Sequence, residues 1–420
     1  MTQRPDEPTQ ETDPLIMSAS PEIAFVKTWR QLIRMPSRSS PSGGEEGKLQ
    51  QHVAAQMRKC GARVRTFEAD NVPGFRSHPL CHGPNRSYAD RPTVLGEIGP
   101  EDAPALLVVA HSDTVQLDCT RPASEWTVDP FAGLLRDNAV WGLGAGDDKW
   151  GVASMLAILD RLQDANLSRR IIFGSTIDEE HGVGNGMLLL MLAGVKAEAC
   201  LYLDGGEAHV AIAKLGGSNL YLHPRGGMDP IRFRDDARKL ETACRELSLA
   251  RADLFDRPFF EGHHQREKSV LLSPQRGSEE PFHRIAFYTL EGEKAEEVCA
   301  ALEAMVGATL GDRMTLYRLT YRRPWFEPQF VDPNAVPARL LSDAYTEVTG
   351  KPAMIRAATK QDSFVLNNHA GIPTVSFGAG RFTGYGCYHS PDEHVDIDLG
   401  WECCRVAHGA VTKWLAGGKI

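Results

Sequence analysis

The clearest hydrophobic pattern in the chain is a set of short, continuous apolar runs, each followed by polar or glycine residues. Runs of this length are typical of strands that are buried on both faces of a parallel sheet. We therefore predict that they form the centre of one sheet, and that 64–67 and 93–98 add further strands. The central runs are 105–110, 171–173, 200–203 and 373–377.

Helical periodicity separates these apolar runs. Val152, Met155, Leu156 and Leu159 recur three and four positions apart, which predicts an amphipathic helix over 151–163. The alternation of strands and helices indicates an α/β fold, in which helices sandwich a mainly parallel sheet. Similar patterns predict helices over 21–35, 45–59, 185–193, 336–349 and 401–415.

Residues 208–332 do not follow this alternation. Their order of strands and helices predicts a small α+β domain inserted into a larger domain, which consists of 21–207 and 333–420. A stretch rich in Pro, Gly, His and Asn, 70–91, predicts a long surface loop. Within the inserted segment we expect strands at 210–213, 219–222, 284–290 and 314–322, and helices at 237–250 and 293–306.

Composition and charge exclude several classes of protein. A chain of 420 residues, 42% of them hydrophobic, is long enough for two globular domains. The formal charge of -9 argues against a nucleic-acid partner, which would need a basic face. No apolar run approaches the length of a membrane span, so we expect no membrane partner.

The N-terminus and the cysteines indicate the compartment. Residues 1–20 are rich in Pro, Thr and acidic side chains and have no apolar core, which predicts a disordered tail and not a signal peptide. The nine cysteines show no CxxC spacing. Scattered, unpaired cysteines in a chain of this size are typical of reduced thiols, so we expect a cytoplasmic protein.

A glycine-rich turn, 142–146, delivers Asp147 to the start of the helix predicted over 151–163. Such turns often bind phosphate, but this one has the spacing of neither the dinucleotide-binding nor the P-loop motif. The adjacent carboxylates of Asp147 and Asp148 would also repel an anion. The sequence therefore predicts that a cation binds here.

Further metal-ligating side chains follow the predicted strands. The carboxyl ends of strands in an open α/β sheet line one crevice, so we expect these side chains to meet there. Imidazole and carboxylate groups from several loops, with an open coordination position, are what a metal-dependent hydrolase needs. The candidate ligands are His111, Asp147, Glu180, Asp204 and His389.

Two more carboxylates have candidate catalytic roles. Asp113 can hold the second ring nitrogen of His111. Glu179 cannot point the same way as Glu180 and is free to act as general base toward a metal-bound water. Taken singly, each of these groups is more often an ordinary structural or solvated residue. The hypothesis of a metal site depends on the complete set, which follows the predicted strands in order along the chain. Asp148, Lys149, His181 and Glu393 are each consistent with ordinary surface charge.

With these motifs the chain resembles the co-catalytic metallopeptidases and amidohydrolases, a family that includes aminoacylases, glutamate carboxypeptidase, peptidase T and succinyl-diaminopimelate desuccinylase. The resemblance covers about 21–206 and 333–415. The matching segments are His111–Asp113, Trp126–Phe131, Trp141–Gly151, Thr176–Glu180, Asp204–Gly206 and His389–Glu393.

The resemblance implies a two-metal site. His111, Asp147 and Asp204 would bind one ion; Asp147, Glu180 and His389 would bind the other. It also implies Glu179 as the base, a cis peptide bond after Asp147, and zinc, manganese or cobalt as the metal, with one or two ions bound. The inserted domain would act as a lid and as the dimerisation surface of a homodimer or higher homo-oligomer, and the partner would be a small-molecule substrate.

The chain departs from the family in the inserted domain. Family members carry a lid histidine that stabilises the oxyanion of the reaction, and Met228 stands at that position here. Loss of an oxyanion donor costs an amidase about 10²–10³ in rate. Another group must substitute for the histidine, or the substrate forms no carbonyl oxyanion. The candidate substitutes are His223, His263, His264 or a lid arginine.

Three functions are consistent with this sequence. The leading hypothesis is hydrolysis of a C–N bond in a small carboxylate-bearing substrate, such as an amide, a peptide or an N-acyl amino acid. The alternative is hydrolytic deamination of an electron-poor aminobenzoate such as 5-nitroanthranilate, an activity of an outlying branch of the family that has no need of a lid histidine. A catalytically inactive binding module is the third, and the intact set around Glu179 argues against it.

Overall fold

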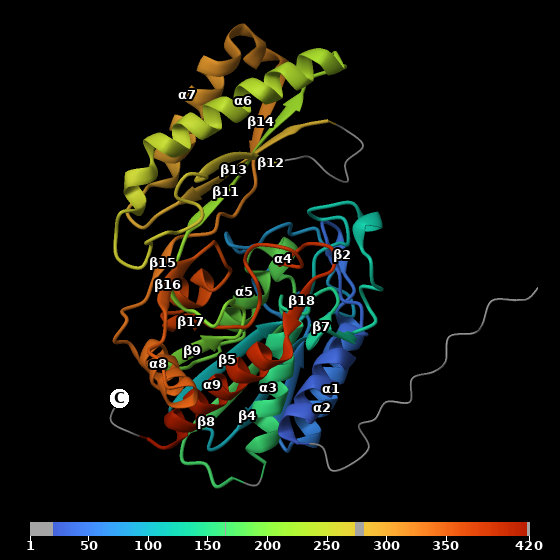
Figure 1. Cartoon of the computed structure of the whole chain (residues 1–420), viewed down its shortest axis with the longest axis vertical. Coiled ribbons are helices and arrows are strands. Elements are labelled where there is room, and N and C mark those ends of the chain that lie inside the picture. The colour runs from blue at the N-terminus through green and yellow to red at the C-terminus, as the bar shows by residue number, and fades with distance from the viewer. Residues whose placement is uncertain (1–19, 164, 274–280, 418–420) are drawn as a thin grey trace, which may run out of the picture.

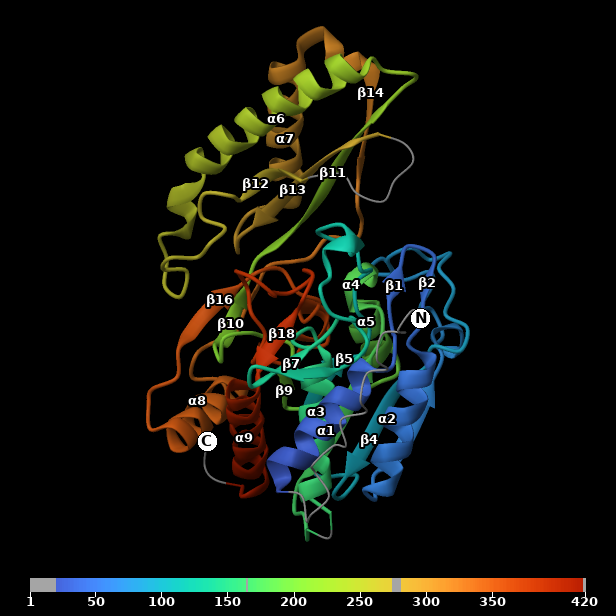
Figure 2. The same cartoon turned by 45° about the vertical axis from the view of Figure 1, so that its right-hand side comes forward.

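The computed structural model describes residues 20–163, 165–273 and 281–417, which form a large lobe and a small lobe (Figures 1 and 2). The tail predicted over 1–20 lies outside the described residues, apart from Ser20. None of the described helices combines the length and the apolar character that a membrane crossing requires.

A nine-stranded mixed sheet forms the centre of the large lobe. Its strands are β3 (Arg63–Phe67), β4 (Thr93–Ile98), β5 (Ala105–His111), β8 (Arg170–Thr176), β9 (Ala199–Tyr202), β10 (Val210–Lys214), β15 (Gln329–Phe330), β16 (Ile355–Ala358) and β17 (Thr374–Ser376). The order is β15-β10-β17-β9-β5-β8-β4-β3, with β16 also paired to β10. The four central strands β17, β9, β5 and β8 are parallel, and antiparallel pairs flank them. The predicted α/β class is confirmed.

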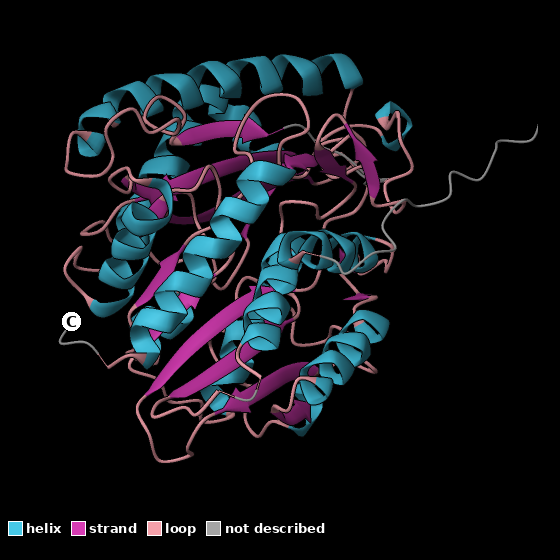
Figure 3. Ribbon diagram, turned by 60° about the horizontal axis from the view of Figure 1, so that its bottom comes forward, coloured by secondary structure: helices cyan, strands magenta, loops and turns pink. Residues whose placement is uncertain are grey.

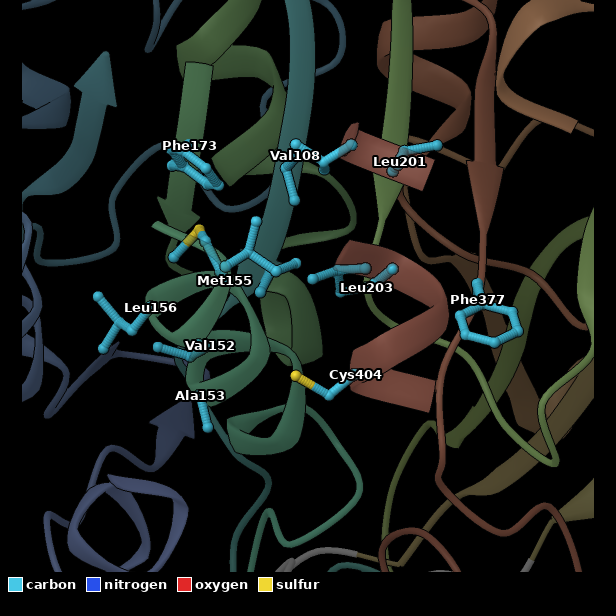
Figure 4. Packing of buried hydrophobic residues seen from close by; sticks show 14 of the residues in the cluster. Val108, Val152, Ala153, Met155, Leu156, Phe173, Leu201, Leu203, Phe377 and Cys404 are labelled. Carbon is cyan, nitrogen blue, oxygen red and sulfur yellow. The ribbon is translucent and has the colours of Figure 1, made fainter. Parts of the chain in front are cut away.

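Helices cover both faces of this sheet (Figure 3). Successive residues of β5 point to opposite faces, so Val108 belongs to one buried cluster and Val109 to the other. The helices are α1 (Pro21–Ile33), α2 (Gly47–Lys59), α3 (Lys149–Arg161), α8 (Val336–Thr349) and α9 (Ile397–Leu415) in the first cluster, and α5 (Asn185–Leu192) in the second. Figure 4 shows Val152 and Met155 of α3 beside Val108, as the helical periodicity predicts.

Short elements carry the loops around the sheet. They are β1 (Ser39–Ser40), β2 (Gly43–Gly44), β6 (Leu134–Arg136), β7 (Ala139–Trp141), β18 (His394–Asp396), α4 (Glu179–Gly182), 3₁₀ turns at Ala69–Asn71 and Ala123–Glu125, and a π turn at Val365–His369. The stretch predicted as a surface loop, 70–91, is irregular but partly internal, because Phe75 and Tyr88 are buried in a core cluster. A Pro- and Gly-rich composition predicts irregular backbone but not its depth.

The small lobe is a four-stranded antiparallel sheet with the order β12-β13-β11-β14, packed against two helices. The elements are β11 (Gly216–Pro224), α6 (Pro230–Ala250), β12 (Val270–Ser273), β13 (His283–Thr289), α7 (Ala295–Leu310), β14 (Tyr317–Tyr321) and 3₁₀ turns at Ala252–Phe255 and Gly311–Leu316. The segment 208–332 also contains β10 and β15, which lie in the large sheet. The chain therefore enters the small lobe between β10 and β11 and leaves it between β14 and β15.

Candidate active site

The candidate ligands meet at the carboxyl ends of the central parallel strands. His111 ends β5 and pairs in register with Thr176, the last residue of β8. Glu179 and Glu180 therefore follow β8 on the same edge of the sheet, and Asp204 comes two residues after β9 ends. This arrangement follows from the parallel pairing of β8, β5 and β9.

Two groups of ligand atoms share Asp147. Its Oδ1 lies 2.8 Å from Nε2 of His111, which is 4.0 Å from Oδ2 of Asp204. Its Oδ2 lies 2.9 Å from Nε2 of His389, which is 3.0 Å from Oε2 of Glu180. Within each group of three residues the ligand atoms lie within 4.8 Å of one another. The carboxylate of Asp147 thus faces both groups, one oxygen toward each.

These residues fit divalent metal ions. Nε2 of His389 and Oε1 of Glu180 are buried and have no hydrogen-bond partner of good geometry among the described residues. Buried polar atoms in proteins are normally satisfied, so such a pair beside a shared carboxylate indicates a missing ligand. Imidazole nitrogens and carboxylate oxygens coordinate zinc at about 2.0–2.2 Å. Atoms that bind one ion at this distance lie close to one another, as the ligand atoms of each group do here.

Asp113 fixes the turn that carries the two glutamates. Its carboxylate accepts hydrogen bonds from the backbone N–H groups of Glu179 and Glu180, each at 3.0 Å. Nδ1 of His111 lies 3.1 Å from the backbone oxygen of Asp113 and 3.5 Å from its carboxylate. The contact predicted between this carboxylate and the imidazole is therefore the longer one, and the side chain mainly orients the turn.

The turn is also held from its other side by Asp178, which adopts a left-handed backbone conformation with φ of 65°. Its buried carboxylate accepts hydrogen bonds from Tyr88 and Asn185, each at 2.9 Å, and forms ion pairs with Arg86 and Arg91. Both arginines come from the stretch predicted as a surface loop. Two carboxylates, Asp113 and Asp178, thus bracket the position of Glu179.

Glu393 organises the glycine-rich turn before Asp147. Its carboxylate accepts hydrogen bonds from the backbone of Gly144 at 2.9 Å, Gly146 at 2.8 Å and Asp147 at 3.2 Å. The peptide bond after Asp147 is cis, as the resemblance implies. The interpretation of Glu393 as ordinary surface charge is wrong, since the side chain is buried and holds three backbone donors.

The same correction applies to the two residues after Asp147. Asp148 is buried, and its carboxylate accepts hydrogen bonds from the backbone N–H groups of His111 at 3.1 Å and Gly151 at 3.0 Å. Lys149 is also buried and donates from Nζ to the backbone oxygen of Met35 at 2.6 Å. Neither of the two is a surface charge. Single-residue patterns cannot show this, because burial is decided by the elements that pack over the turn.

Burial and charge shift the pKa values of the acidic groups in opposite directions. Burial raises the pKa of Glu180 to about 7, and it raises that of Glu179 well above the ordinary value, with a further contribution from Asp362. Burial also acts to raise the pKa of Asp147, but hydrogen bonds to His111 and His389 outweigh it and lower the pKa. Asp147 is therefore held as the anion that a bridging ligand must be.

Comparison with known proteins places the chain in a family. The family described as Peptidase family M20/M25/M40 matches residues 107–413. The chain belongs to this peptidase family. It is similar to a succinyl-diaminopimelate desuccinylase from Methylobacterium radiotolerans, with 39% identity over 25% of this chain and 26% of the relative. An acetylornithine deacetylase from Erwinia tasmaniensis is 31% identical over 37% of this chain and 36% of the relative.

The solved structures extend this similarity to the fold. Human carnosine dipeptidase 1 matches with a TM-score of 0.70 and 14% identity, over 94% of this chain and 97% of that chain. The alignments to the desuccinylase and the deacetylase span only about a quarter to a third of those relatives. The predicted family and fold are confirmed, and the sequence similarity is concentrated in part of the chain.

The candidate site opens into a cavity of about 360 Å³, which residues of both lobes line. Of the residues considered as substitutes for a lid histidine, His264 lines this cavity. His223 lies 3.2 Å from Thr320 through its Nε2 atom, and His263 packs beside Phe255 and Phe260. The wall of the cavity consists of Asp147, Glu179, Asp204, Gly205, Gly206, His209, Ala211, Lys214, His264, Tyr288, Ala357, Ala358, Thr359, Lys360, Gln361, Phe382, Tyr388 and His389.

Several residues of this candidate site were not predicted. Gln361 donates from Nε2 to the backbone oxygen of Asp204 at 2.7 Å, and Asp362 is fully buried with neither carboxylate oxygen hydrogen-bonded to a described residue. Lys214 and Lys360 line the cavity. The polar run 359–362 directly after β16 was the available signal, since the other site residues also follow strands.

Proposed function

We propose that the protein is a metal-dependent hydrolase that cleaves a C–N bond of amide type in a small, carboxylate-bearing substrate. The observation that carries this proposal is the convergence of two ligand groups on Asp147 in the cavity that also contains Glu179. Membership of the M20 peptidase family supports it. So do the names of the relatives, a desuccinylase and a deacetylase, which both denote amide hydrolysis.

The residues have separate roles in this proposal. His111, Asp147 and Asp204 would hold one divalent ion, and Asp147 with Glu180 and His389 would hold a second. A bound ion supplies a polarised carbonyl and a water of lowered pKa.

Glu179 removes the proton from the attacking water and returns it to the leaving nitrogen. Burial raises its pKa well above the ordinary value, which makes the carboxylate a stronger base toward the water. Asp113 and Asp178 keep Glu179 in place.

The metal, the assembly and the compartment belong to the same proposal. Ligand sets of histidine and carboxylate accept zinc, manganese and cobalt, and we propose zinc or manganese, with cobalt also accepted. We further propose a homodimer or higher homo-oligomer in the cytoplasm, with the small lobe as lid and dimerisation surface. Light scattering of the purified protein tests the assembly, and elemental analysis of the protein as isolated tests the metal.

Replacement of the base tests the mechanism. In Glu179→Gln the turnover should fall by about 10²–10⁴, because the water loses its proton acceptor while every metal ligand stays in place. The matched control is Glu198→Gln, an exposed glutamate just before β9 that should leave turnover unchanged. Unaltered turnover in Glu179→Gln with full metal content would contradict the proposal.

A substrate panel with added manganese separates amide hydrolysis from the alternative. We expect release of the acid from N-succinyl or N-acetyl amino acids. The panel also includes 5-nitroanthranilate, because Met228 cannot replace the lid histidine. Its sulfur accepts a hydrogen bond from the Tyr317 hydroxyl at 3.1 Å inside the small lobe, and a thioether has no hydrogen to donate to an oxyanion. Ammonia released from 5-nitroanthranilate, with all amides inert, would replace the amide proposal by the deamination alternative.

A further inference from the structure

Two lysines line the cavity that contains the candidate metal ligands. Lys214 is the last residue of β10, and Lys360 comes two residues after β16. The two strands are parallel neighbours, and Lys214 pairs in register with Ala358 (Figure 2). Both lysines line the same cavity as Glu179 and Asp204. The cavity therefore carries two amines in addition to its acidic groups.

Neither amine has a close acidic partner within the described part of the protein. Asp204, Asp362 and Glu179 act to raise the pKa of Lys214, but burial outweighs them. Among the residues that the structure describes, neither Nζ forms a hydrogen bond or an ion pair, and the Lys214 side chain belongs to a residue only 3% exposed. A buried, unpaired ammonium is strongly disfavoured. Burial accordingly lowers the pKa of Lys214 to about 8 and that of Lys360 to about 7. Such a costly arrangement is typical of a site whose charge is satisfied by a ligand.

The surroundings of Lys360 add positive charge instead of removing it. Its Nζ lies 5.0 Å from the ring centroid of Tyr288 and 5.7 Å from that of Phe326. Apart from burial, the neighbours that lower its pKa are Arg322 and Arg284, which belong to the small-lobe side. Nε of Arg284 is buried and has no hydrogen-bond partner among the described residues. The amine of Lys360 thus lies between aromatic rings in a region without a balancing acid.

We propose that Lys214 and Lys360 form an anion subsite that binds two carboxylates of the substrate on the side away from the cleaved bond. Two separate amines are available, and a single carboxylate would neutralise one of them and leave the other buried and unpaired. A neutral substrate would leave both amines unpaired. A site whose polar groups are built to bind charges rejects such a substrate strongly. The substrate class is therefore a small amide that carries two carboxylates on one fragment.

This subsite rests on the proposed function, because it uses the same cavity, but a binding measurement tests it without turnover. Calorimetry on the manganese-loaded protein compares glutarate, a dicarboxylate, with butyrate, a monocarboxylate of similar size. The variants are Lys214→Met and Lys360→Met. Lys351→Met is the control, since Lys351 is exposed and lies near the start of the same strand.

We expect the unaltered protein to bind glutarate more tightly than butyrate. Each loss of a charge-assisted contact should weaken glutarate binding by about tenfold to a hundredfold. Butyrate binding should change less, and Lys351→Met should match the unaltered protein. The ratio of the two affinities is the decisive quantity, because a partly unfolded variant lowers both affinities alike, and carboxylate binding to manganese contributes to both.

Two results would overturn the subsite. One is equal affinity for glutarate and butyrate in the unaltered protein, and the other is an unchanged affinity ratio in both lysine variants. Failure of the proposed function gives a different pattern, in which no amide is hydrolysed while the glutarate preference and its loss in the variants persist. The two failures can therefore be told apart.

Discussion

Asp147 is the residue on which the candidate metal centre depends, because its two oxygens face different imidazoles at 2.8 and 2.9 Å. No other carboxylate in the two ligand groups is shared between them. The turn that presents it is held by Glu393 through three backbone donors. The position of this one side chain is therefore set in part by a residue far away in the sequence.

Metal affinity should depend on pH through Glu180. Its pKa is raised to about 7 by burial, so below pH 7 the metal-free protein carries a proton that an ion must displace. We expect the proton at Glu180 to make apparent manganese affinity rise from about pH 5.5 to about 7.5. Burial acts to lower the pKa values of His111 and His389, but neighbouring carboxylates outweigh it and raise both well above the usual value, so loss of their protons should extend the rise to higher pH. Competition with a chelator at several pH values measures this, and a flat profile would contradict it.

The same group has the opposite effect on the stability of the metal-free protein. Between the ordinary value of 4.5 and about 7, the folded state binds more protons at Glu180 than the unfolded state does. Its contribution to stability is therefore present at low pH and is lost as pH rises through about 7. Glu180→Gln should remove both effects, which makes it the matched variant for the affinity measurement.

Sequence patterns predicted the ligands better than the groups around them. His111, Glu180 and Asp204 follow strands whose apolar runs are unmistakable, so their convergence could be anticipated from strand topology. Lys214 ends β10 and Lys360 follows β16. The polar run 359–362 was a weak signal, because β16 has no apolar run of its own that marks it as a strand. The two lysines indicate a ligand site because they line a cavity and have no close partner among the described residues, and this can be seen only in the folded chain.

The irregular stretch between β3 and β4 is an element with a structural role that its composition hides. It inserts Arg86 and Arg91 beneath the turn that carries Glu179, where Arg86 pairs with Asp178 and Arg91 forms two hydrogen bonds of 2.6 Å with Glu46. A loop predicted from Pro and Gly content is expected to lie in solvent. Arg86 and Arg91 are buried instead, and their burial is tolerated because both charges are paired with carboxylates.

Removal of one buried partner should be costly. Arg86→Met leaves a buried carboxylate with one fewer cation, and we expect it to lower the free energy of unfolding by about 3–5 kcal/mol. Arg121→Met removes an exposed ion pair with Glu125, where the N–O distance is 3.2 Å, and should cost about 0–1 kcal/mol. Urea unfolding of both variants gives the comparison. Equal costs would show that the Arg86 pair adds no stability beyond that of a surface pair.

The first strand of the small lobe depends on a glycine. Gly217 in β11 has φ of 125°, and a Cβ there would collide with the backbone oxygen of Phe287 on β13. We expect Gly217→Ala to lower stability by at least about 1–3 kcal/mol, from backbone strain and the displaced strand. Gly226→Ala is the control, since a Cβ at that position would meet no atom within 4 Å. Thermal melts decide, and equal melting temperatures would refute the expectation.

Element boundaries show where local patterns stop being sufficient. Helix α6 begins at Pro230, earlier than the predicted 237, because Asp229 caps it by accepting the N–H of Ile231 at 3.1 Å. Ile231 and Phe233 are two positions apart, which is not a helical spacing, so periodicity alone does not detect the first turns. Strand β11 likewise begins at Gly216, ahead of the predicted 219, since pairing with β13 and not side-chain pattern sets its start.

At the scale of the whole molecule, the two lobes share one cavity. Tyr288 of the small lobe and Lys360 of the large lobe both line it, together with the metal-ligand wall. A substrate in this cavity would contact both lobes at once. The candidate metal ligands come from the large lobe, and the small lobe adds further residues to the lining of the cavity.

Metal removal should weaken the whole large lobe. The ligands come from β5, the loops after β8 and β9, the start of α3 and the loop before β18, so a bound ion connects distant parts of the chain. An ion at about a hundred times its dissociation constant adds about 2.7 kcal/mol, which corresponds to about 5 °C in melting temperature. Calorimetry with and without a chelator, followed by manganese addition, tests this. An unchanged melting temperature would contradict it.

The position of His389 has a consequence for the synthesis of the protein. This ligand belongs to the last tenth of the chain, whereas His111 is translated long before it. A ribosome that stops early would release a product with most of the central strands but an incomplete coordination sphere. Products that end before His389 would lack one imidazole of the second ligand group, so we expect them to retain no ion there.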